Sequence, residues 1–398
     1  KTCLKSDRRK AVCGSIDFRG NETRSDSKIR FCFCGQNMSD RLVGIWGIRM
    51  EEQQHKRRVR YKGTHPKTYT EKYKEHHPEK YADTIEKVIR KGSTPAGMHL
   101  PIMVQEILDF LQIKPGQKGL DATLGYGGHT RKMLEQLQGT GHICALDVDP
   151  IELVRTKERL EQAGYGTAQL TIIQENFAKI DQIAKTHGPF DFILADLGVS
   201  SMQIDNPDRG FSYKVEGPLD LRLNPEKGIS AAERLRELTP EELEGMLIEN
   251  SDEPYAAKIA AEITRTLRRK EPIETTTQLR EVIEKALSFL PANNEKKELI
   301  KKTCQRTFQA LRIDVNSEFE VLEAFLDKLP DALAPNGRVA ILTFHSGEDR
   351  MVKKAFKQGK KQGVFCEISE EVIRPSREEC RQNPRARSTK LRWAVKTS

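Results

Sequence analysis

The sequence predicts an α/β protein with a doubly wound parallel sheet and an inserted helical domain. A short apolar strand over Leu120–Leu124 runs into a glycine-rich turn, which a helical stretch over Arg131–Leu137 follows. Apolar runs then alternate with helical stretches as far as Asp196, and from about residue 211 to 302 the signals are helical. Such alternation builds a parallel sheet that binds its ligand at the carboxyl ends of the strands.

The glycine-rich turn indicates a ligand that contacts the backbone closely. Gly127 and Gly128 stand at a strand-to-helix turn, where a Cβ would obstruct such an approach. A second apolar run, His142–Asp147, ends in a carboxylate suited to two ribose hydroxyls. A dinucleotide and S-adenosylmethionine both fit this layout, but the dinucleotide fingerprint needs glycine where Thr130 stands. The turn therefore favours S-adenosylmethionine, with a plain tight turn as the alternative.

The remaining elements of the sheet follow in order. The pattern before the helical block predicts two helices and then two strands, over Ile102–Leu111, Ile151–Gln162, Gln169–Ile173 and Phe190–Asp196. After the block it predicts a helix and two strands, over Arg306–Leu326, Arg338–Phe344 and Lys390–Val395. A final strand after the main alternation is typical of the seven-stranded methyltransferase sheet, whose last strand runs antiparallel. Phe177 follows the third strand, where its ring covers an adenine or packs in the core.

Capping signals divide the helical block into separate helices. Ser230–Glu233 and Thr239–Glu242 both match a capping box, and Pro254 begins another helix that ends near Arg268. We expect this block, residues 211–302, to be inserted between a first core segment, 94–210, and a second, 303–398.

Charge and composition restrict the class of partner. The net charge is +9, yet residues 1–90 hold 22 Lys and Arg against 12 Asp and Glu, while the rest holds 45 against 46. This excess indicates a polyanionic partner, foremost a nucleic acid, although a solvated tail would look the same. No apolar run reaches the roughly 18 residues of a membrane span. The eight cysteines include no C-x-x-C pair, so no metal site is indicated and a reducing compartment is expected.

The first 93 residues fall into two parts. Residues 1–49 begin with Lys and lack an apolar period, which suggests a non-native or disordered extension. An organelle transit peptide is the alternative, and it would place the protein in a matrix or stroma instead of the cytoplasm. Residues 50–93 form a basic arm whose tyrosines offer stacking platforms for unpaired bases, or pack the arm on its own body.

The loop after the fourth strand begins with Asp196. An amine attached to a cytosine delocalises its lone pair into the ring, and an acceptor for its N–H bonds restores its nucleophilicity. Asp196 either plays this part, holds the methionine end of the cofactor, or caps a turn.

Several blocks make the chain resemble one family. They are Asp196-Leu-Gly-Val-Ser-Ser, Asp208-Arg-Gly-Phe-Ser, Gly217-Pro-Leu-Asp-Leu-Arg, Arg306-Thr-Phe-Gln-Ala-Leu-Arg-Ile, Phe344-His-Ser and Asn383-Pro-Arg-Ala-Arg. In this order they resemble the bacterial-type small-subunit ribosomal RNA cytosine-N(4)-methyltransferases, the MraW family. The resemblance implies a class I methyltransferase fold, S-adenosylmethionine as donor and a cytosine of the decoding region as target. It also implies ribosomal RNA as partner, within an assembled or nearly assembled small subunit.

The resemblance also suggests site residues. It implies cofactor contacts at Gly127, Gly128, His129, Asp147, Phe177, Asp196 and Gln203. Asp196 and His345 are the candidate catalytic residues, although His345-Ser346 also fits a helix start with Ser346 as the cap of an S-x-x-D box. The expected RNA contacts are Arg209, Arg222, Arg306, Arg312, Asn316, Arg385 and Arg387.

The chain departs from the family pattern at Tyr126, Met202, Gly347 and Lys302–Gln305, which places the substrate geometry in question. The absence of a Pro-Cys dipeptide disfavours the covalent route to carbon-5 methylation. A catalytically inactive RNA-binding assembly factor is the rival hypothesis.

Overall fold

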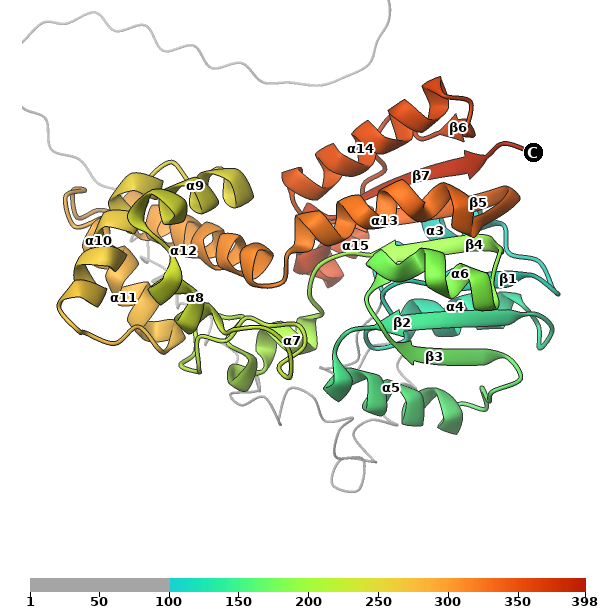
Figure 1. Ribbon diagram of the computed structural model, residues 1–398, viewed down its shortest axis with the longest axis horizontal. Coiled ribbons are helices and arrows are strands. Elements are labelled where there is room, and N and C mark those ends of the chain that lie inside the picture. The colour runs from blue at the N-terminus through green and yellow to red at the C-terminus, as the bar shows by residue number, and fades with distance from the viewer. Residues whose placement is uncertain (1–100) are drawn as a thin grey trace, which may run out of the picture. The chain divides into compact units, whose positions relative to one another are not determined.

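The computed structural model describes residues 101–398, whose strands form one seven-stranded sheet (Figure 1). The strands are β1 (Lys118–Asp121), β2 (His142–Asp147), β3 (Leu170–Gln174), β4 (Phe190–Asp196), β5 (Leu333–Thr343), β6 (Phe365–Ile368) and β7 (Lys390–Lys396). Their order is β3-β2-β1-β4-β5-β7-β6, and β7 is antiparallel to both of its neighbours. This confirms the class I methyltransferase sheet with an antiparallel last strand. The predicted extension (1–49), the basic arm (50–93) and residues 94–100 lie outside the described residues.

Helices cover both faces of the sheet. One face packs against α6 (Ile180–His187), α13 (Glu318–Ala332) and α14 (Ser346–Lys361). The other packs against α3 (Val104–Leu111), α4 (Gly128–Gln136) and α5 (Pro150–Gln162). Strand β4 serves both layers, because Ile193 points into the first core and Phe192 and Leu194 into the second. This alternation fixes the register of β4 and therefore the position of Asp196 at its end.

The insert has a hydrophobic core of its own. Its helices are α8 (Ala231–Glu237), α9 (Pro240–Ser251), α10 (Ala256–Arg268), α11 (Thr276–Ala286) and α12 (Asn294–Val315). They enclose a separate apolar cluster that includes Leu247, Ile259 and Leu311. Both predicted capping boxes are confirmed, since Ser230 and Thr239 accept the N–H groups of Glu233 and Glu242. The predicted boundary after residue 302 falls inside α12.

The single helix predicted over Arg306–Leu326 is wrong. Helix α12 ends at Val315, and α13 begins at Glu318 after Ser317, which has a left-handed backbone with φ of 48°. The chain therefore turns where it leaves the insert for the sheet.

The short elements lie around the carboxyl edge and near the end of the chain. They are α7 (Ser201–Asp205), α15 (Arg377–Gln382) and three 3₁₀ turns, η2 (Phe177–Lys179), η3 (Pro207–Arg209) and η4 (Pro384–Ser388). On β7, Trp393 stacks on Phe110 of α3 with 4.5 Å between ring centroids, so the last strand is tied to the first described helix. None of the helices within residues 101–398 is both long and apolar enough to cross a membrane.

Gly119 in β1 tests the packing between β1 and β4. A Cβ at Gly119 would overlap the ring of Phe192, which is fully buried. We expect Gly119→Ala to lower the free energy of unfolding by about 1–3 kcal/mol, the cost of overpacking a core. Gly166→Ala is the matched control, because a Cβ there meets nothing within 4 Å. Chemical denaturation measures both, and equal stability of the two variants would contradict this account.

Candidate active site

Three strands bring carboxylates to one edge of the sheet. Asp121, Asp147 and Asp196 are the last residues of β1, β2 and β4, which are neighbours in the order β2-β1-β4. The glycine-rich turn joins β1 to α4 at the same edge. Asp147 and Asp196 were predicted from the sequence as site residues, and both lie at the edge that holds this turn.

The glycine-rich turn leaves no room for side chains beneath it. Gly127 has φ of 79°, and a Cβ there would lie 2.8 Å from the Cγ2 atom of Thr156 on α5. Helix α4 begins at Gly128, with His129 in its first turn. The first N–H groups of a helix have no intrahelical partner, so this turn presents donors to a ligand.

Asp147 keeps acceptor capacity after its internal contacts. One carboxylate oxygen accepts the N–H of Gly125 at 2.7 Å, and the other accepts the N–H of Asp149 at 2.9 Å. Each carboxylate oxygen has two acceptor positions, so one on each oxygen is left for two ribose hydroxyls. Burial raises the pKa of Asp147 to about 6, despite these two backbone donors. Additional donors from a ligand would stabilise the ionised form.

Asp196 lies against His129. The Oδ2 atom of Asp196 is 3.5 Å from Nδ1 of His129, while Nε2 of His129 lies 2.9 Å from the carbonyl oxygen of Ile102. A carbonyl oxygen only accepts, so Nε2 carries the proton of a neutral ring and Nδ1 presents a lone pair to Asp196. A close contact between the two therefore requires one further proton, on the ring or on the carboxylate.

The other oxygen of Asp196, Oδ1, is buried and has no hydrogen-bond partner among the described residues. Burial raises the pKa of Asp196 to about 6, although His129 opposes this shift. Asp121 lies deeper, where it accepts the hydroxyl of Thr130 at 2.5 Å, and burial raises its pKa too. Of the three acids, Asp196 is therefore the one with a buried carboxylate oxygen that has no hydrogen-bond partner among the described residues.

A buried ion pair connects this edge to the insert. Asp149, which is fully buried, caps α5 and accepts Nη1 of Arg209 at 2.6 Å and Nε2 of Gln203 at 2.8 Å. Arg209 uses Nη2 to bind the carbonyl oxygens of Arg222 and Leu223 at 3.1 and 2.8 Å. Gln203 also accepts the N–H of Ser200, so both ends of its amide bind within the protein.

Four of the seven predicted RNA contacts bind within the protein, where the insert joins the sheet domain. Besides Arg209, Arg222 forms a salt bridge with Asp220, and Arg312 donates two hydrogen bonds to Glu318. The amide of Asn316 binds the backbone of Leu221, Leu223 and Arg312. These contacts position the insert, and contacts of the same residues with RNA stay predictions.

The other three predicted RNA contacts lie nearer to solvent. Arg306 is 3.8 Å from the buried carboxylate of Glu253, and Arg385 donates to Asp205 at 2.7 Å. Arg387 is exposed. Phe177 packs edge-on against Phe325 with ring centroids 5.2 Å apart and is only partly buried, so core packing accounts for part of its surface.

The predicted cap at Ser346 is wrong, because His345 caps α14. The ring of His345 accepts the N–H of Glu348, whose carboxylate in turn accepts the N–H of His345. Glu318, His345 and Glu348 could together face one metal ion. However, both oxygens of Glu318 bind Arg312, and Oε2 of Glu348 binds two backbone N–H groups. This group is therefore an ion network that lowers the pKa of Glu348 against the effect of its burial.

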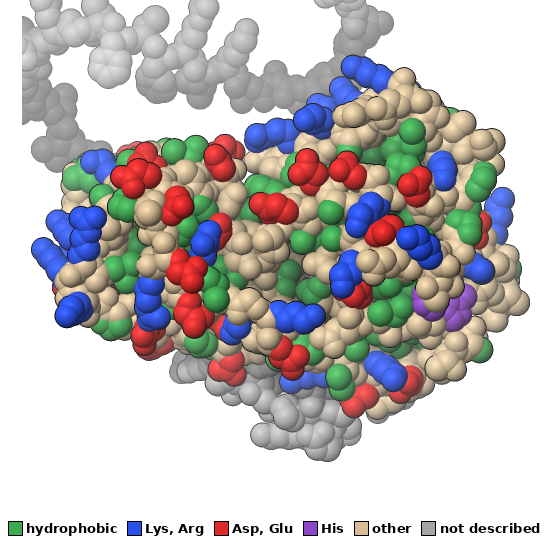
Figure 2. All heavy atoms as spheres, in the orientation of Figure 1, with side chains coloured by type: hydrophobic (Ala, Val, Ile, Leu, Met, Phe, Trp, Pro, Cys, Tyr) green, Lys and Arg blue, Asp and Glu red, His purple; other side chains and the backbone are tan. Residues whose placement is uncertain are grey.

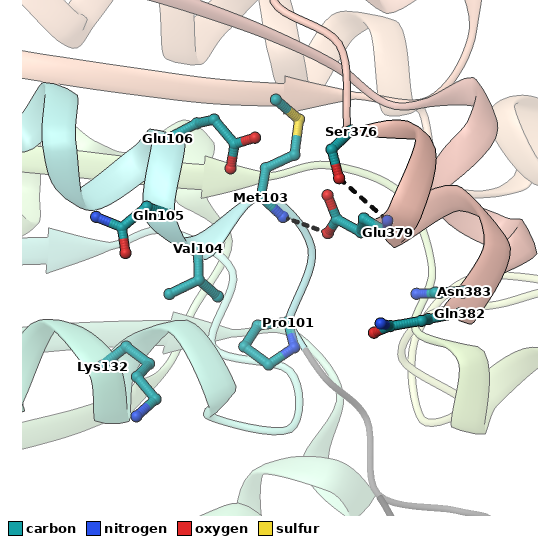
Figure 3. Close-up of a pocket in the computed structure, with 10 residues that line it drawn as sticks. All are labelled: Pro101, Met103, Val104, Gln105, Glu106, Lys132, Ser376, Glu379, Gln382 and Asn383. Carbon is teal, nitrogen blue, oxygen red and sulfur yellow. Dashed lines mark hydrogen bonds between the residues drawn. The ribbon is translucent and has the colours of Figure 1, made fainter. Parts of the chain in front are cut away.

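One cavity among the described residues lies away from these acids. Its volume is about 410 Å³, and Pro101, Val104, Lys132 and Gln382 are among its lining residues (Figure 3). Glu379 accepts the N–H of Met103 across it at 2.8 Å. Neither Asp147 nor Asp196 lines this cavity, so its size says nothing about the candidate site.

Comparison with known proteins identifies the family. The model of the MraW methylase family matches residues 96–397. The chain belongs to the MraW methylase family. It is 68% identical over 363 residues, 91% of this chain and 99% of the relative, to ribosomal RNA small subunit methyltransferase H 1 of Lachnoclostridium phytofermentans. It is 38% identical to ribosomal RNA small subunit methyltransferase H of Koribacter versatilis, over 75% of this chain and 94% of the relative.

Comparison with solved structures adds little to the family assignment. A SAM-dependent O-methyltransferase from Thermotoga maritima matches with a TM-score of 0.33 and 12% identity, covering 74% of this chain and 64% of that one. This score is too low for an argument from structural likeness. Membership of the MraW family makes the chain a methyltransferase that uses S-adenosylmethionine. The glycine-rich turn and the free acceptor positions of Asp147 fit that cofactor.

Asp149 and Thr123 are two residues of this edge that the sequence did not predict. Asp149-Pro150 carries the signal of a helix start, an Asp cap followed by Pro at the first position. Thr123 accepts the N–H of Asp196 at 2.7 Å and so holds the end of β4 against the turn after β1. No local sequence pattern marks that contact.

The Asp149–Arg209 pair predicts a large loss of stability when one charge is removed. We expect Arg209→Met to cost about 3–5 kcal/mol of unfolding free energy, because Asp149 remains as a buried, uncompensated charge. Adding Asp149→Asn should restore part of this loss, because it removes the uncompensated charge and Asn also caps helices well. Denaturant titration of the single and double variants measures both effects. A double variant less stable than Arg209→Met would refute the explanation.

Asp196 predicts a pH-dependent stability. Its pKa is about 6 in the folded protein against an ordinary value of 3.8, so ionisation disfavours the fold as pH rises from about 4 through 6. We expect Asp196→Asn to match the wild type in melting temperature near pH 4 and to exceed it above about pH 7. Thermal unfolding at a series of pH values measures the difference. A constant difference at every pH would contradict a raised pKa.

Proposed function

We propose that this MraW-family methyltransferase transfers a methyl group to the exocyclic 4-amino group of a cytosine in the decoding region of small-subunit ribosomal RNA. The observation that supports it most is Asp196, a carboxylate with an unpartnered buried oxygen at the edge where the cofactor turn lies. Relatives at 58–68% identity are named ribosomal RNA small subunit methyltransferases, which disfavours the inactive assembly factor. A protein that only bound RNA would have no use for the acceptor pattern of Asp147.

The cofactor contacts predicted from the sequence fit around the glycine-rich turn. Asp147 would hold the ribose, and the N–H groups of Gly128 and His129 would bind polar atoms of the methionine part. Phe177, which begins η2 after β3 and is only partly buried, would cover the adenine. Gln203 would contact the cofactor only if its amide exchanged a present partner, since both of its ends are bound. S-adenosylmethionine, when bound, supplies an electrophilic methyl group.

Asp196 would act on the amine. By accepting an N–H of the cytosine amino group, it turns the nitrogen lone pair out of the ring and toward the methyl carbon. The bound cofactor would give up its methyl group and leave as a thioether, and the amine that receives the group would then have to release a proton. When Asp196 is ionised and the ring of His129 is neutral, the two groups face each other without a shared proton. This pair can therefore accept the proton that the amine releases. Positioning and charge stabilisation of this kind supply much of an enzymatic rate enhancement.

The ribosomal setting completes the proposal. We expect the target nucleotide to be presented within an assembled or nearly assembled small subunit, in the bacterial cytoplasm, because the relatives are bacterial. The expected RNA contacts at Arg306, Arg385 and Arg387 are accessible enough to take part. His345 is a weaker candidate, since Glu348 already engages its ring.

Substitution of Asp196 tests the reaction. We expect Asp196→Ala to abolish nearly all turnover and Asp196→Asn, which retains one acceptor oxygen, to bind RNA and cofactor better than it turns over. Nucleoside mass spectrometry of ribosomal RNA should identify a cytosine methylated on its exocyclic nitrogen. Methyl on carbon-5 or on the ribose, or full activity of Asp196→Ala, would refute the mechanism.

Substitution of Asp147 tests the cofactor assignment. Asp147→Ala should lose roughly 2–4 kcal/mol of S-adenosylmethionine affinity, the contribution of two hydrogen bonds to a charged group. Glu158→Ala, at an exposed position of α5, serves as the control. Calorimetry measures both, and unchanged affinity in a folded Asp147→Ala variant would remove Asp147 from the site.

A further inference from the structure

Helix α14 carries a row of cations along its exposed face. Its solvent-facing basic residues are Arg350, Lys353, Lys354, Lys357, Lys360 and Lys361, and all six are exposed. They recur at intervals of three, four and seven residues, so they share one side of the helix. From Met351 to Cys366 the chain has no Asp or Glu. Figure 2 shows Lys and Arg side chains gathered over α14 at the upper edge of this view.

The row is concentrated charge on an otherwise balanced body. Residues 101–398 contain 44 Lys and Arg against 46 Asp and Glu. A surface that serves solubility mixes both signs, whereas this one has a single sign along its length. From Arg350 to Lys361 the row extends about 16 Å along the helix, long enough to meet several consecutive phosphates of one strand.

Packing does not account for the row. The opposite face of α14 is buried through Val352 and Phe356 in the core beside the sheet. Within residues 101–398, Lys353, Lys354, Lys357 and Lys361 form no ion pair, and Lys360 reaches only the exposed Glu370 at 3.7 Å. Like charges three or four residues apart destabilise a helix. The helix dipole favours cations in the last turn, which accounts for Lys360 and Lys361 but not for the three lysines before them.

The row begins beside the candidate active site. Helix α14 follows β5, and β5 lies next to β4, whose last residue is Asp196. The first cation of the row, Arg350, lies 4.0 Å from Asp252 at the end of α9, so this end of the helix faces the insert. A strand that delivers one base to Asp196 could therefore continue along α14.

We propose that this cationic row, defined as Arg350, Lys353, Lys354, Lys357, Lys360 and Lys361, binds the phosphate backbone of the RNA beside the target nucleotide. The inference rests on the proposed function and adds to it the surface that aligns the substrate. Phosphate contacts release condensed counterions, so each one contributes to the salt dependence of binding. The row contributes affinity and register, while recognition of the cytosine belongs to the site at Asp196.

Salt titration of RNA binding tests the row. The full chain would carry Lys353→Gln, Lys354→Gln, Lys357→Gln and Lys361→Gln, substitutions that preserve helix propensity. Binding to a small-subunit ribosomal RNA fragment is measured across a range of NaCl concentrations. We expect the slope of log Kd against log salt to fall by about 3, since each of the four phosphates that a lysine no longer neutralises lowers it by about 0.7–0.9. KM for RNA should rise, with kcat at saturating RNA and S-adenosylmethionine affinity unchanged.

Two further variants serve as controls. The matched control removes four exposed lysines of other elements, Lys114, Lys118, Lys157 and Lys185, and should leave the slope near that of the wild type. A variant with Arg at the same four positions, 353, 354, 357 and 361, keeps the charge and should keep the slope. A wild-type slope in the Gln variant, or an equal fall in the control, would overturn the inference.

The outcomes also separate this inference from the proposed function. If the wild type methylates the RNA but the Gln variant keeps its salt slope, only the row is refuted. If the wild type neither binds nor methylates the RNA, both fail. Loss of binding to vesicles with anionic lipid, with RNA binding intact, would assign the row to a membrane surface and overturn the proposal.

Discussion

The buried ion pair between Asp149 and Arg209 is the interaction on which most of the site depends. Asp149 caps α5 two residues after Asp147, the last residue of β2, and Arg209 donates to the carbonyl oxygens of Arg222 and Leu223 in the insert. Because both charges are buried, neither tolerates the loss of the other. The loop after Asp147, the candidate ribose ligand, and the insert expected to receive RNA are therefore held by the same contact.

The carboxyl edge of the sheet combines acids that the fold does not favour. Burial raises the pKa of Asp121, Asp147 and Asp196, which means that their charged forms are poorly solvated where they stand. A ligand that brings donors to Asp147 and Asp196 relieves this cost and stabilises the folded chain. Functional sites commonly retain such unfavourable groups because the chemistry requires them. The well-packed layers on both faces of the sheet make this tolerable.

The sequence was sufficient for features that depend on neighbours in the chain. The glycine-rich turn, Asp147 and Asp196 follow strand ends, so local patterns locate them. The role of Arg209 could not be predicted, because its partner Asp149 lies 60 residues away and an arginine is normally exposed.

The misplaced elements have the same origin. The break between α12 and α13 contains no glycine or proline, and the tertiary contacts of Asn316 accompany it. At α14 the cap is His345 and not Ser346, and Asp349, the expected partner of Ser346, binds Arg392 of β7.

The contact between Trp393 and Phe110 has a spectroscopic consequence. Trp393 is one of two tryptophans in the chain, and residues 211–315 contain none. With Trp46 replaced by Phe, selectively excited tryptophan fluorescence would report on the sheet alone, whereas far-ultraviolet circular dichroism would also register the helices of the insert. Comparing the two signals during unfolding distinguishes one cooperative unit from two.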